Sequence, residues 1–252
     1  MQARGLDGNI PENPKIQEMA SYYLKEIRSV QPHGPYNLGG YCLGGILAYE
    51  AAQQLRAANE EVSLLVLINT GRQGYPKYPS NATGAHRAYF KLATRLSLEF
   101  ENLSSDRSRS FLVRLLHRAR RLREVSQARA EMLLERVLGR KGRHHSLIYE
   151  LERLGIVHDR AGNAYEPNPY DGKVVMLNAK RQPAGAVPDP KLGWDGILTG
   201  EIEIDVIPGF RQNLLDEPNV EVLSGHLAKA LHLSESVNNQ NELLRDDLIS
   251  SR

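Results

Sequence analysis

The chain has 252 residues, of which 41% are hydrophobic and 25% charged, and its 32 Lys and Arg against 30 Asp and Glu leave a formal net charge of +2. This composition predicts a globular chain with a buried core and excludes an intrinsically disordered one. A single Cys excludes an intramolecular disulfide, and the apolar runs fall short of the roughly 18 residues that span a bilayer. The first residues lack the apolar core of a signal peptide, so we expect a cytoplasmic protein without a membrane anchor.

The first part of the chain alternates between predicted helices and strands. Asn13 and Pro14 favour a helix start, and apolar residues then recur at helical spacing to about residue 30. Residues 36–41 predict a short buried strand that ends in glycines, and a helix follows to about Ala58. Residues 62–68 form a continuous apolar run, which is typical of a strand buried on both faces of a parallel sheet.

The same alternation returns near the C-terminus, after about a hundred residues without a convincing strand. Residues 173–179 and 201–207 are the next predicted strands, and Pro218 opens a final helix. The tail from Val237 is polar, and we expect it to fray. The intervening helical segments are expected at residues 85–102, 107–139 and 145–154.

These elements predict an α/β fold with a parallel sheet that a helical insertion interrupts. We expect the core to comprise residues 1–80 and 165–235, with the insertion at 81–164 and the polar tail at 236–252.

Residues 40–44 have the sequence Gly-Tyr-Cys-Leu-Gly, which fits the nucleophile elbow Gly-x-Ser-x-Gly with Cys in place of Ser. The strand predicted before this motif and the helix predicted after it provide the expected context. A helix N-terminus favours a thiolate at Cys42, and the backbone N–H of Leu43 would face a developing oxyanion. The alternative interpretation is a buried Cys in a tight glycine-rich turn.

Asn69 directly follows the predicted strand at residues 62–68, at the carboxyl edge of the sheet, where the sites of parallel sheets collect. Two interpretations of Asn69 stay open. It orients an imidazole, as Asn does in Cys-His-Asn proteases, or it is a polar strand cap. None of the eight His residues follows a predicted strand end, which is where a general base would be expected.

Three motifs, in this order along the chain, resemble type I thioesterase domains, which end nonribosomal peptide and polyketide synthetases. The motifs are YNLGGYCLGGILAYE at 36–50, LLVLINT at 64–70, and IPG at 207–209 with LLDEP at 214–218. The resemblance implies an α/β-hydrolase fold in which residues 81–164 form a helical lid. It also implies that a Ser or Cys takes an acyl chain from the phosphopantetheine thioester of a carrier protein, before water, an amine or a hydroxyl releases it. No directly bound cofactor is implied.

Carried over to this sequence, the resemblance assigns Cys42 as the nucleophile, Leu43 as the backbone oxyanion donor and Asn69 as the acid, which is usually Asp. The family places its His one or two residues beyond the Pro-Gly pair, where this chain has Phe210 and Arg211. Neither residue acts as a general base near neutral pH. The charge of Arg211 would favour a thiolate, and a Cys nucleophile needs a base less than a Ser does.

Members of the family also have strands and a Gly-rich loop upstream of the elbow, whereas this chain starts where the family is already past them. The resemblance therefore predicts that the early strands are missing and that the strand at residues 36–41 lies at an exposed sheet edge, which favours association. Two explanations stay open: residue 1 is a fragment boundary, or another chain supplies the missing strands.

Four functional hypotheses follow. The first is a thioesterase that uses Cys42, and the second is a degenerate, non-catalytic domain that only docks a carrier protein. The third is an α/β hydrolase with a Cys nucleophile similar to dienelactone hydrolases, which needs the same missing His. The fourth is nucleic-acid binding by an Arg-rich helix, which the lack of an interleaved aromatic platform disfavours.

The near-neutral net charge averages two opposite regions. Residues 107–143 contain eleven Arg and one Lys against three Glu, a net charge of +9, so the remainder of the chain has a net charge of −7. Charge runs usually form a solvated helix face. Because carrier proteins of such assembly lines are typically acidic, the resemblance implies that Arg118, Arg120 and Arg121 of the lid steer an acidic carrier protein.

Overall fold

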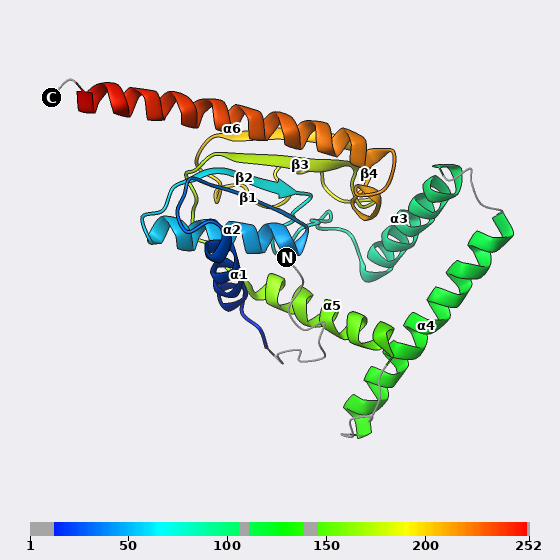
Figure 1. Cartoon of the computed structure of the whole chain (residues 1–252). Helices are drawn as coiled ribbons and strands as arrows, with labels where there is room; N and C mark the ends of the chain where they lie inside the picture. The colour runs from blue at the N-terminus through cyan, green and yellow to red at the C-terminus, as the bar shows by residue number, and fades with distance from the viewer. Residues whose placement is uncertain (1–12, 106–110, 139–145, 251–252) are drawn as a thin grey trace.

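A computed structural model describes residues 13–105, 111–138 and 146–250 and has an α/β architecture (Figure 1). A four-stranded sheet has the order β1-β2-β3-β4, and all neighbouring strands are parallel. The strands are β1 (Tyr36–Tyr41), β2 (Val62–Ile68), β3 (Val174–Arg181) and β4 (Ile202–Phe210). The helices are α1 (Ile16–Val30), α2 (Leu43–Ala57), α3 (Gly84–Ser105), α4 (Phe111–Leu138), α5 (Leu147–Ala164) and α6 (Asn219–Ser250), with a 3-10 turn η1 (Arg211–Asn213). The predicted fold class is confirmed.

Helices cover both faces of the sheet, with α1 and α2 on one side and α6 on the other (Figure 1). Side chains of β2 alternate between the two layers: Leu65 and Leu67 pack towards α1 and α2, whereas Leu64 and Val66 pack towards α6. Strand β3 alternates in the same way. The continuous apolar run of β2 is therefore explained by burial on both faces, as in other parallel sheets.

Helices α3, α4 and α5 occupy the sequence between β2 and β3 and project away from the sheet (Figure 1). Helix α5 begins after Ser146, whose hydroxyl accepts a hydrogen bond from the N–H of Tyr149 at 3.2 Å. It continues ten residues beyond the predicted end at residue 154, because Val157 and Ala161 bury apolar surface beyond Gly155. That burial outweighs the roughly 0.5–1 kcal/mol by which a helical glycine is disfavoured.

Other element ends also differ from prediction, among them the end of α3 at Ser105 instead of residue 102 and the end of β3 at Arg181 instead of residue 179. The N-cap of α1 is Lys15 rather than Asn13, and α6 runs on to Ser250 instead of fraying from Val237. Strand β4 continues through Pro208 to Phe210. Proline lacks an N–H for the ladder, and β4 tolerates it because it is an edge strand of this sheet.

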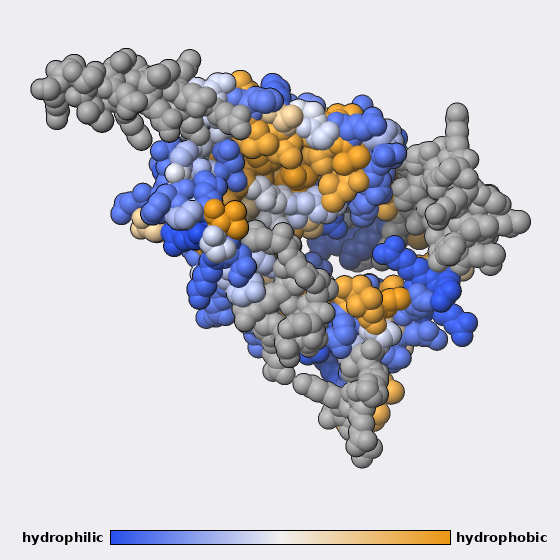
Figure 2. Space-filling view, in the orientation of Figure 1, coloured by the Kyte–Doolittle hydropathy of each residue, from blue (hydrophilic) through white to orange (hydrophobic). Residues whose placement is uncertain are grey.

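Strand β1 forms the other edge of the sheet in the described part of the chain, as predicted. A cavity of about 270 Å³ adjoins it, with apolar walls from Leu38, Val66 and Leu231 among others. Figure 2 shows an apolar surface in this region, below α6. Across the described residues, no helix has both the length and the apolar character needed to cross a membrane.

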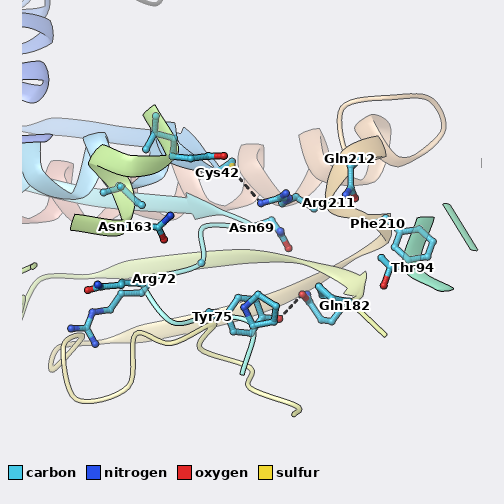
Figure 3. Close-up of a pocket in the computed structure, with 18 of the residues that line it drawn as sticks. Cys42, Asn69, Arg72, Tyr75, Thr94, Asn163, Gln182, Phe210, Arg211 and Gln212 are labelled. Atoms are coloured by element: carbon cyan, nitrogen blue, oxygen red, sulfur yellow. Dashed lines mark hydrogen bonds between the residues drawn. The ribbon is translucent and has the colours of Figure 1, made fainter. Parts of the chain in front are cut away.

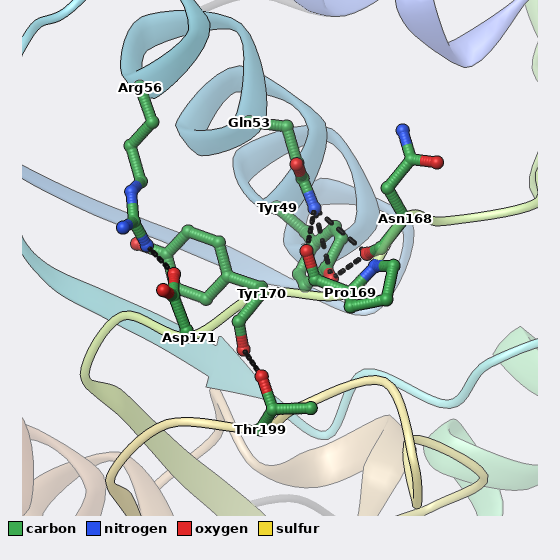
Figure 4. Close-up of polar contacts among 8 residues, drawn as sticks. All are labelled: Tyr49, Gln53, Arg56, Asn168, Pro169, Tyr170, Asp171 and Thr199. Atoms are coloured by element: carbon green, nitrogen blue, oxygen red, sulfur yellow. Dashed lines mark hydrogen bonds and ion pairs between the residues drawn. The ribbon is translucent and has the colours of Figure 1, made fainter.

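The segment that leads from α5 back to β3 is hydrogen-bonded to side chains of α2 (Figure 4). The Tyr49 hydroxyl and the Gln53 amide both donate to the carbonyl oxygen of Asn168, at 2.5 and 2.8 Å. One turn further along α2, Arg56 forms an ion pair with Asp171. These contacts fix the C-terminal end of the helical insertion relative to the helix that follows Cys42.

A second link joins α2 to the end of α5. The Tyr165 hydroxyl donates to the Glu50 carboxylate at 2.6 Å, and both residues are buried. Burial, together with this hydrogen bond, raises the pKa of Tyr165 above its ordinary value. The hydroxyl therefore remains a donor to the carboxylate at neutral pH.

Candidate active site

Cys42 forms the turn between β1 and α2 and has a strained backbone conformation. Its φ and ψ are 54° and −117°, a region that residues with a Cβ rarely adopt. Its N–H donates to the carbonyl oxygen of Ile68 at 2.9 Å, which ties the turn to the end of β2. The sharp strand-to-helix turn expected of a nucleophile elbow is present, and the thiol is partly exposed at the N-terminus of α2.

Two glycines make this turn possible. A Cβ on Gly40 would lie 2.0 Å from the carbonyl oxygen of Gly44, and a Cβ on Gly45 would lie 1.9 Å from Oγ1 of Thr70. A Cβ on Gly44 would meet nothing within 4 Å. The close approach of helix to sheet therefore depends on Gly40 and Gly45, whereas a side chain at Gly44 would meet none of the described residues.

Cys42 opens into a cavity of about 300 Å³, at the lower end of the size range of ligand pockets (Figure 3). Residues from the carboxyl ends of the strands line it, as expected for a parallel sheet, and they include Asn69, Phe210 and Arg211. Helix α5 contributes Asp159, Gly162 and Asn163, and α3 contributes Thr94. The helical insertion thus forms part of the cavity wall, and the sequence-predicted site residues meet in one place.

Arg211 contacts the side chain of Cys42 directly. Its Nη1 donates to the sulfur of Cys42 at 3.6 Å (Figure 3). The hydroxyl of Tyr41 donates to the carbonyl oxygen of Arg211 and holds this segment against β1. Burial raises the pKa of Tyr41, so the hydroxyl stays protonated and remains a donor. The guanidinium places a permanent positive charge beside the sulfur.

Phe210 occupies the other position at which the resemblance places a His. Its side chain is buried, and its N–H donates to Oδ1 of Asn213 at 2.7 Å. The guanidinium of Arg181 lies over the ring, with 5.4 Å between the guanidinium carbon and the ring centroid. Phe210 therefore packs the end of β4 and places no proton acceptor in the cavity.

Asn69 is buried, with φ at 42°, and lines the cavity with Cys42. Its Oδ1 accepts the N–H of Ala179 at 2.9 Å, a contact that joins the end of β2 to β3. No histidine lines this cavity among the residues that the structure describes. The observed contact is the one expected of a strand cap, and the role of Asn69 in orienting an imidazole stays a prediction.

A second cavity of about 360 Å³ lies on the other side of the elbow and adjoins Gly40, Leu43 and Gly44. Its walls are mostly apolar, and α5 contributes the half-buried side chain of His158. Burial lowers the pKa of His158. Its imidazole is therefore neutral at pH 7.

Several polar residues of the first cavity were not predicted from the sequence. The Tyr75 hydroxyl donates to Oε1 of Gln182 at 2.6 Å, and burial raises the pKa of Tyr75 to about 12. Arg72 lines the cavity with its Nε buried and without a hydrogen-bond partner among the described residues. Arg72 and Gln182 each lie just beyond a strand end, and that position in a parallel sheet was the signal available in the sequence.

The described residues offer no site for a metal ion. Within residues 13–105, 111–138 and 146–250, no three His, Cys, Asp or Glu side chains come together as potential ligands.

A family model described as "Thioesterase domain" matches residues 1–230. Similar proteins include a non-reducing polyketide synthase of Pseudevernia furfuracea, 48% identical over 82 residues, which are 30% of this chain and 4% of the relative. Another is the nonribosomal peptide synthetase apvA of Aspergillus terreus, 34% identical over 171 residues, which are 64% of this chain and 17% of the relative. The chain thus spans only a small part of the length of these relatives.

Two solved structures share the fold. A NocB thioesterase domain, in covalent complex with a fluorophosphonate nocardicin G analogue, is 21% identical with a TM-score of 0.57, over 92% of this chain and 81% of that one. A four-domain nonribosomal peptide synthetase bound to AMP and glycine is 23% identical with a TM-score of 0.61, over 91% of this chain and 17% of that one. At these identities the likeness concerns the fold alone.

Proposed function

The chain belongs to the thioesterase domain family, and from this we propose that it releases an acyl or peptidyl chain from the phosphopantetheine thioester of a carrier protein, with Cys42 as the nucleophile. The observation that supports the proposal best is the strained turn at Cys42, which exposes the thiol to a cavity at the carboxyl edge of the sheet. Relatives of this chain are polyketide and nonribosomal peptide synthetases.

In the first step, the Cys42 thiolate attacks the thioester carbonyl carbon. The N–H of Leu43 is at the first position of α2, where an N–H has no partner within the helix, so it would donate to the oxyanion that forms. Collapse of the intermediate transfers the acyl group to Cys42 and releases the pantetheine thiolate, which takes a proton from water. In the second step, water, an amine or a hydroxyl attacks the acyl-Cys42 thioester and releases the chain.

Arg211 would assist the first step and not the second. Its guanidinium lies 3.6 Å from the sulfur and stabilises a negative charge there, but it stays protonated and accepts no proton from an attacking nucleophile. We therefore expect release from Cys42 to be slower than acylation. The test is steady-state release of free thiol from butyryl-pantetheine, which we expect for the natural chain and not for Cys42→Ala.

The second candidate function is a non-catalytic domain that only docks a carrier protein. Phe210 and Arg211 favour it, because they occupy the positions at which the family has its base. The variant Phe210→His separates the two candidates, with Phe210→Asn as a polar control that has no base. If turnover appears only in Phe210→His, the natural chain is non-catalytic. If the natural chain turns over and Phe210→His is merely faster, Cys42 works without a histidine.

The proposed carrier protein would approach the basic face of α4. Arg120 and Arg121 are exposed, although Arg120 also pairs with Glu124 at 3.0 Å. The side chain of Arg118, the third residue of this prediction, lies outside the described residues. An acidic carrier protein would be steered to this face by long-range attraction, which salt screens.

A further inference from the structure

The cavity beside Cys42 has an excess of positive charge in its lining. Arg72, Arg181 and Arg211 line it, against one carboxylate, that of Asp159. An uncharged acyl chain would gain nothing from these guanidinium groups, since a site for apolar ligands is usually lined by apolar side chains with few polar groups. The positive charge of the lining therefore indicates a ligand with an anionic group, which an uncharged acyl chain does not have.

Arg72 is the least satisfied of the three arginines. Its Nε is buried without a hydrogen-bond partner among the described residues, and within those residues neither Arg72 nor Arg211 forms an ion pair. Asp189 belongs to the loop that Arg72 contacts, but its two carboxylate oxygens accept the N–H groups of Lys191 and Gly193. The Nε itself is covered, so a ligand in the cavity would meet the part of the Arg72 side chain that lines it, where no carboxylate of the described residues balances the charge.

The other two arginines of the lining have contacts of their own. Arg211 donates to the Cys42 sulfur, and Arg181 lies over the ring of Phe210. Figure 3 shows Arg211 beside Cys42 and Arg72 farther from it, with the side chain of Arg72 extending away from Cys42. Since both arginines line one cavity with Cys42, an anion held at Arg72 would lie in the same cavity as the reacting sulfur.

We propose that Arg72 binds an anionic oxygen group of the thioester substrate, with Arg181 and Arg211 adding favourable charge. The group is either a carboxylate on the acyl chain or the phosphate of the pantetheine arm, because the planar guanidinium pairs with both in the same two-bond geometry. This inference rests on the proposed function for the identity of the substrate. It adds that Arg72 is a specificity-determining residue for an anionic substrate.

The test measures binding by calorimetry to the Cys42→Ala chain, in which no acyl transfer takes place. Three probes separate the two sources of the anion: butyryl-pantetheine, which is neutral, butyryl-4′-phosphopantetheine, and glutaryl-pantetheine, in which the acyl chain ends in a carboxylate. We expect one of the two anionic probes to bind about tenfold more tightly than the neutral one, the gain of a charge-assisted hydrogen bond. The anionic probe that binds more tightly identifies whether the acyl chain or the pantetheine arm carries the anionic group.

Variants of the same chain tie the effect to Arg72. Arg72→Gln should abolish the preference, and Arg72→Lys, which keeps the charge without the two-bond geometry, should retain part of it. The control Arg160→Gln removes the same charge from an exposed position on α5 outside the cavity lining and should leave the preference unchanged. Equal binding of all three probes, or a preference that survives Arg72→Gln, overturns the proposal.

The binding test does not depend on catalysis. A chain that prefers the anionic probe but never acylates Cys42 would support this inference and contradict the proposed function. A chain that acylates Cys42 without preferring an anion would do the opposite.

Discussion

The guanidinium of Arg211 and the sulfur of Cys42 lie 3.6 Å apart, although the two residues are 169 positions apart in the sequence. The parallel sheet brings them together, because Cys42 follows β1 and Arg211 follows β4 at the same carboxyl edge. A permanent cation thus stands where the family resemblance places a histidine. This pairing places a positive charge beside the sulfur but offers no proton acceptor for the release step.

Removing the charge of Arg211 should slow the reactions of Cys42. We expect Arg211→Gln to lower the rate of Cys42 alkylation by iodoacetamide at pH 7 about threefold to tenfold, since the thiolate is the reacting form. Arg211→Lys keeps the positive charge and should retain most of the rate. Because Arg211 is exposed, added salt should reduce the difference. Equal rates in all three chains at low salt would show that the contact does not act on the thiol.

The neighbouring glycines of the elbow should respond to alanine in opposite ways. Gly45→Ala places a Cβ 1.9 Å from Oγ1 of Thr70 and should destabilise the fold by about 1–3 kcal/mol, the usual effect of overpacking. Gly44→Ala meets no atom within 4 Å and should be neutral or stabilising by about 0.5–1 kcal/mol, as expected for a helical glycine. Urea unfolding of the two variants measures the difference, and equal destabilisation would contradict the packing described for the elbow.

His158 should make the stability of the protein depend on pH. Its pKa in the folded chain is lowered by burial, so the unfolded chain binds a proton more readily. The stabilisation is therefore present above the ordinary pKa of histidine, about 6.5, and is lost as the pH falls. We expect the urea midpoint to decrease between pH 7.5 and 5.5, and to decrease less in His158→Gln. An equal decrease in the natural chain and in His158→Gln would show that burial of His158 does not cause the pH dependence.

The basic face of α4 should control association with an acidic carrier protein. Neutralising Arg118, Arg120 and Arg121 to Gln should weaken binding severalfold at low salt and make the remaining affinity less sensitive to salt. The control Lys25→Gln removes a positive charge from an exposed position on α1, far along the chain from α4, and should have little effect. Binding that is unchanged by the three substitutions, measured by calorimetry at two salt concentrations, would contradict this docking surface.

The strands and the elbow could be predicted because their signals are local. The apolar run of β2 predicts a buried strand, and the glycines around Cys42 predict a tight turn, each from a few consecutive residues. Both the strand and the turn lie where the sequence predicted them. The extent of α5 was underestimated, because the burial of Val157 beyond a helical glycine depends on the core against which it packs. The continuation of α6 to Ser250 was not predicted, because the sequence beyond Val237 is polar and lacks a helical apolar pattern.

The cavity lining could be predicted only in part, for a similar reason. Cys42, Asn69 and Arg211 follow recognisable motifs, whereas Arg72 and Gln182 lie in loops whose meeting depends on the strand order. Sequence pattern alone did not indicate that β2 and β3 end beside one another. Nor did it indicate that Arg72 would be left with a buried Nε without a partner.

The most direct test of the proposed function is a time course of intact mass after mixing the chain with butyryl-pantetheine. We predict a butyryl adduct that forms faster than it disappears and that peptide mapping places on Cys42, because acylation is assisted by Arg211 and release lacks a base. The adduct should be absent from Cys42→Ala. A folded chain that forms no adduct on Cys42 and releases no thiol would contradict the assignment of Cys42 as the nucleophile.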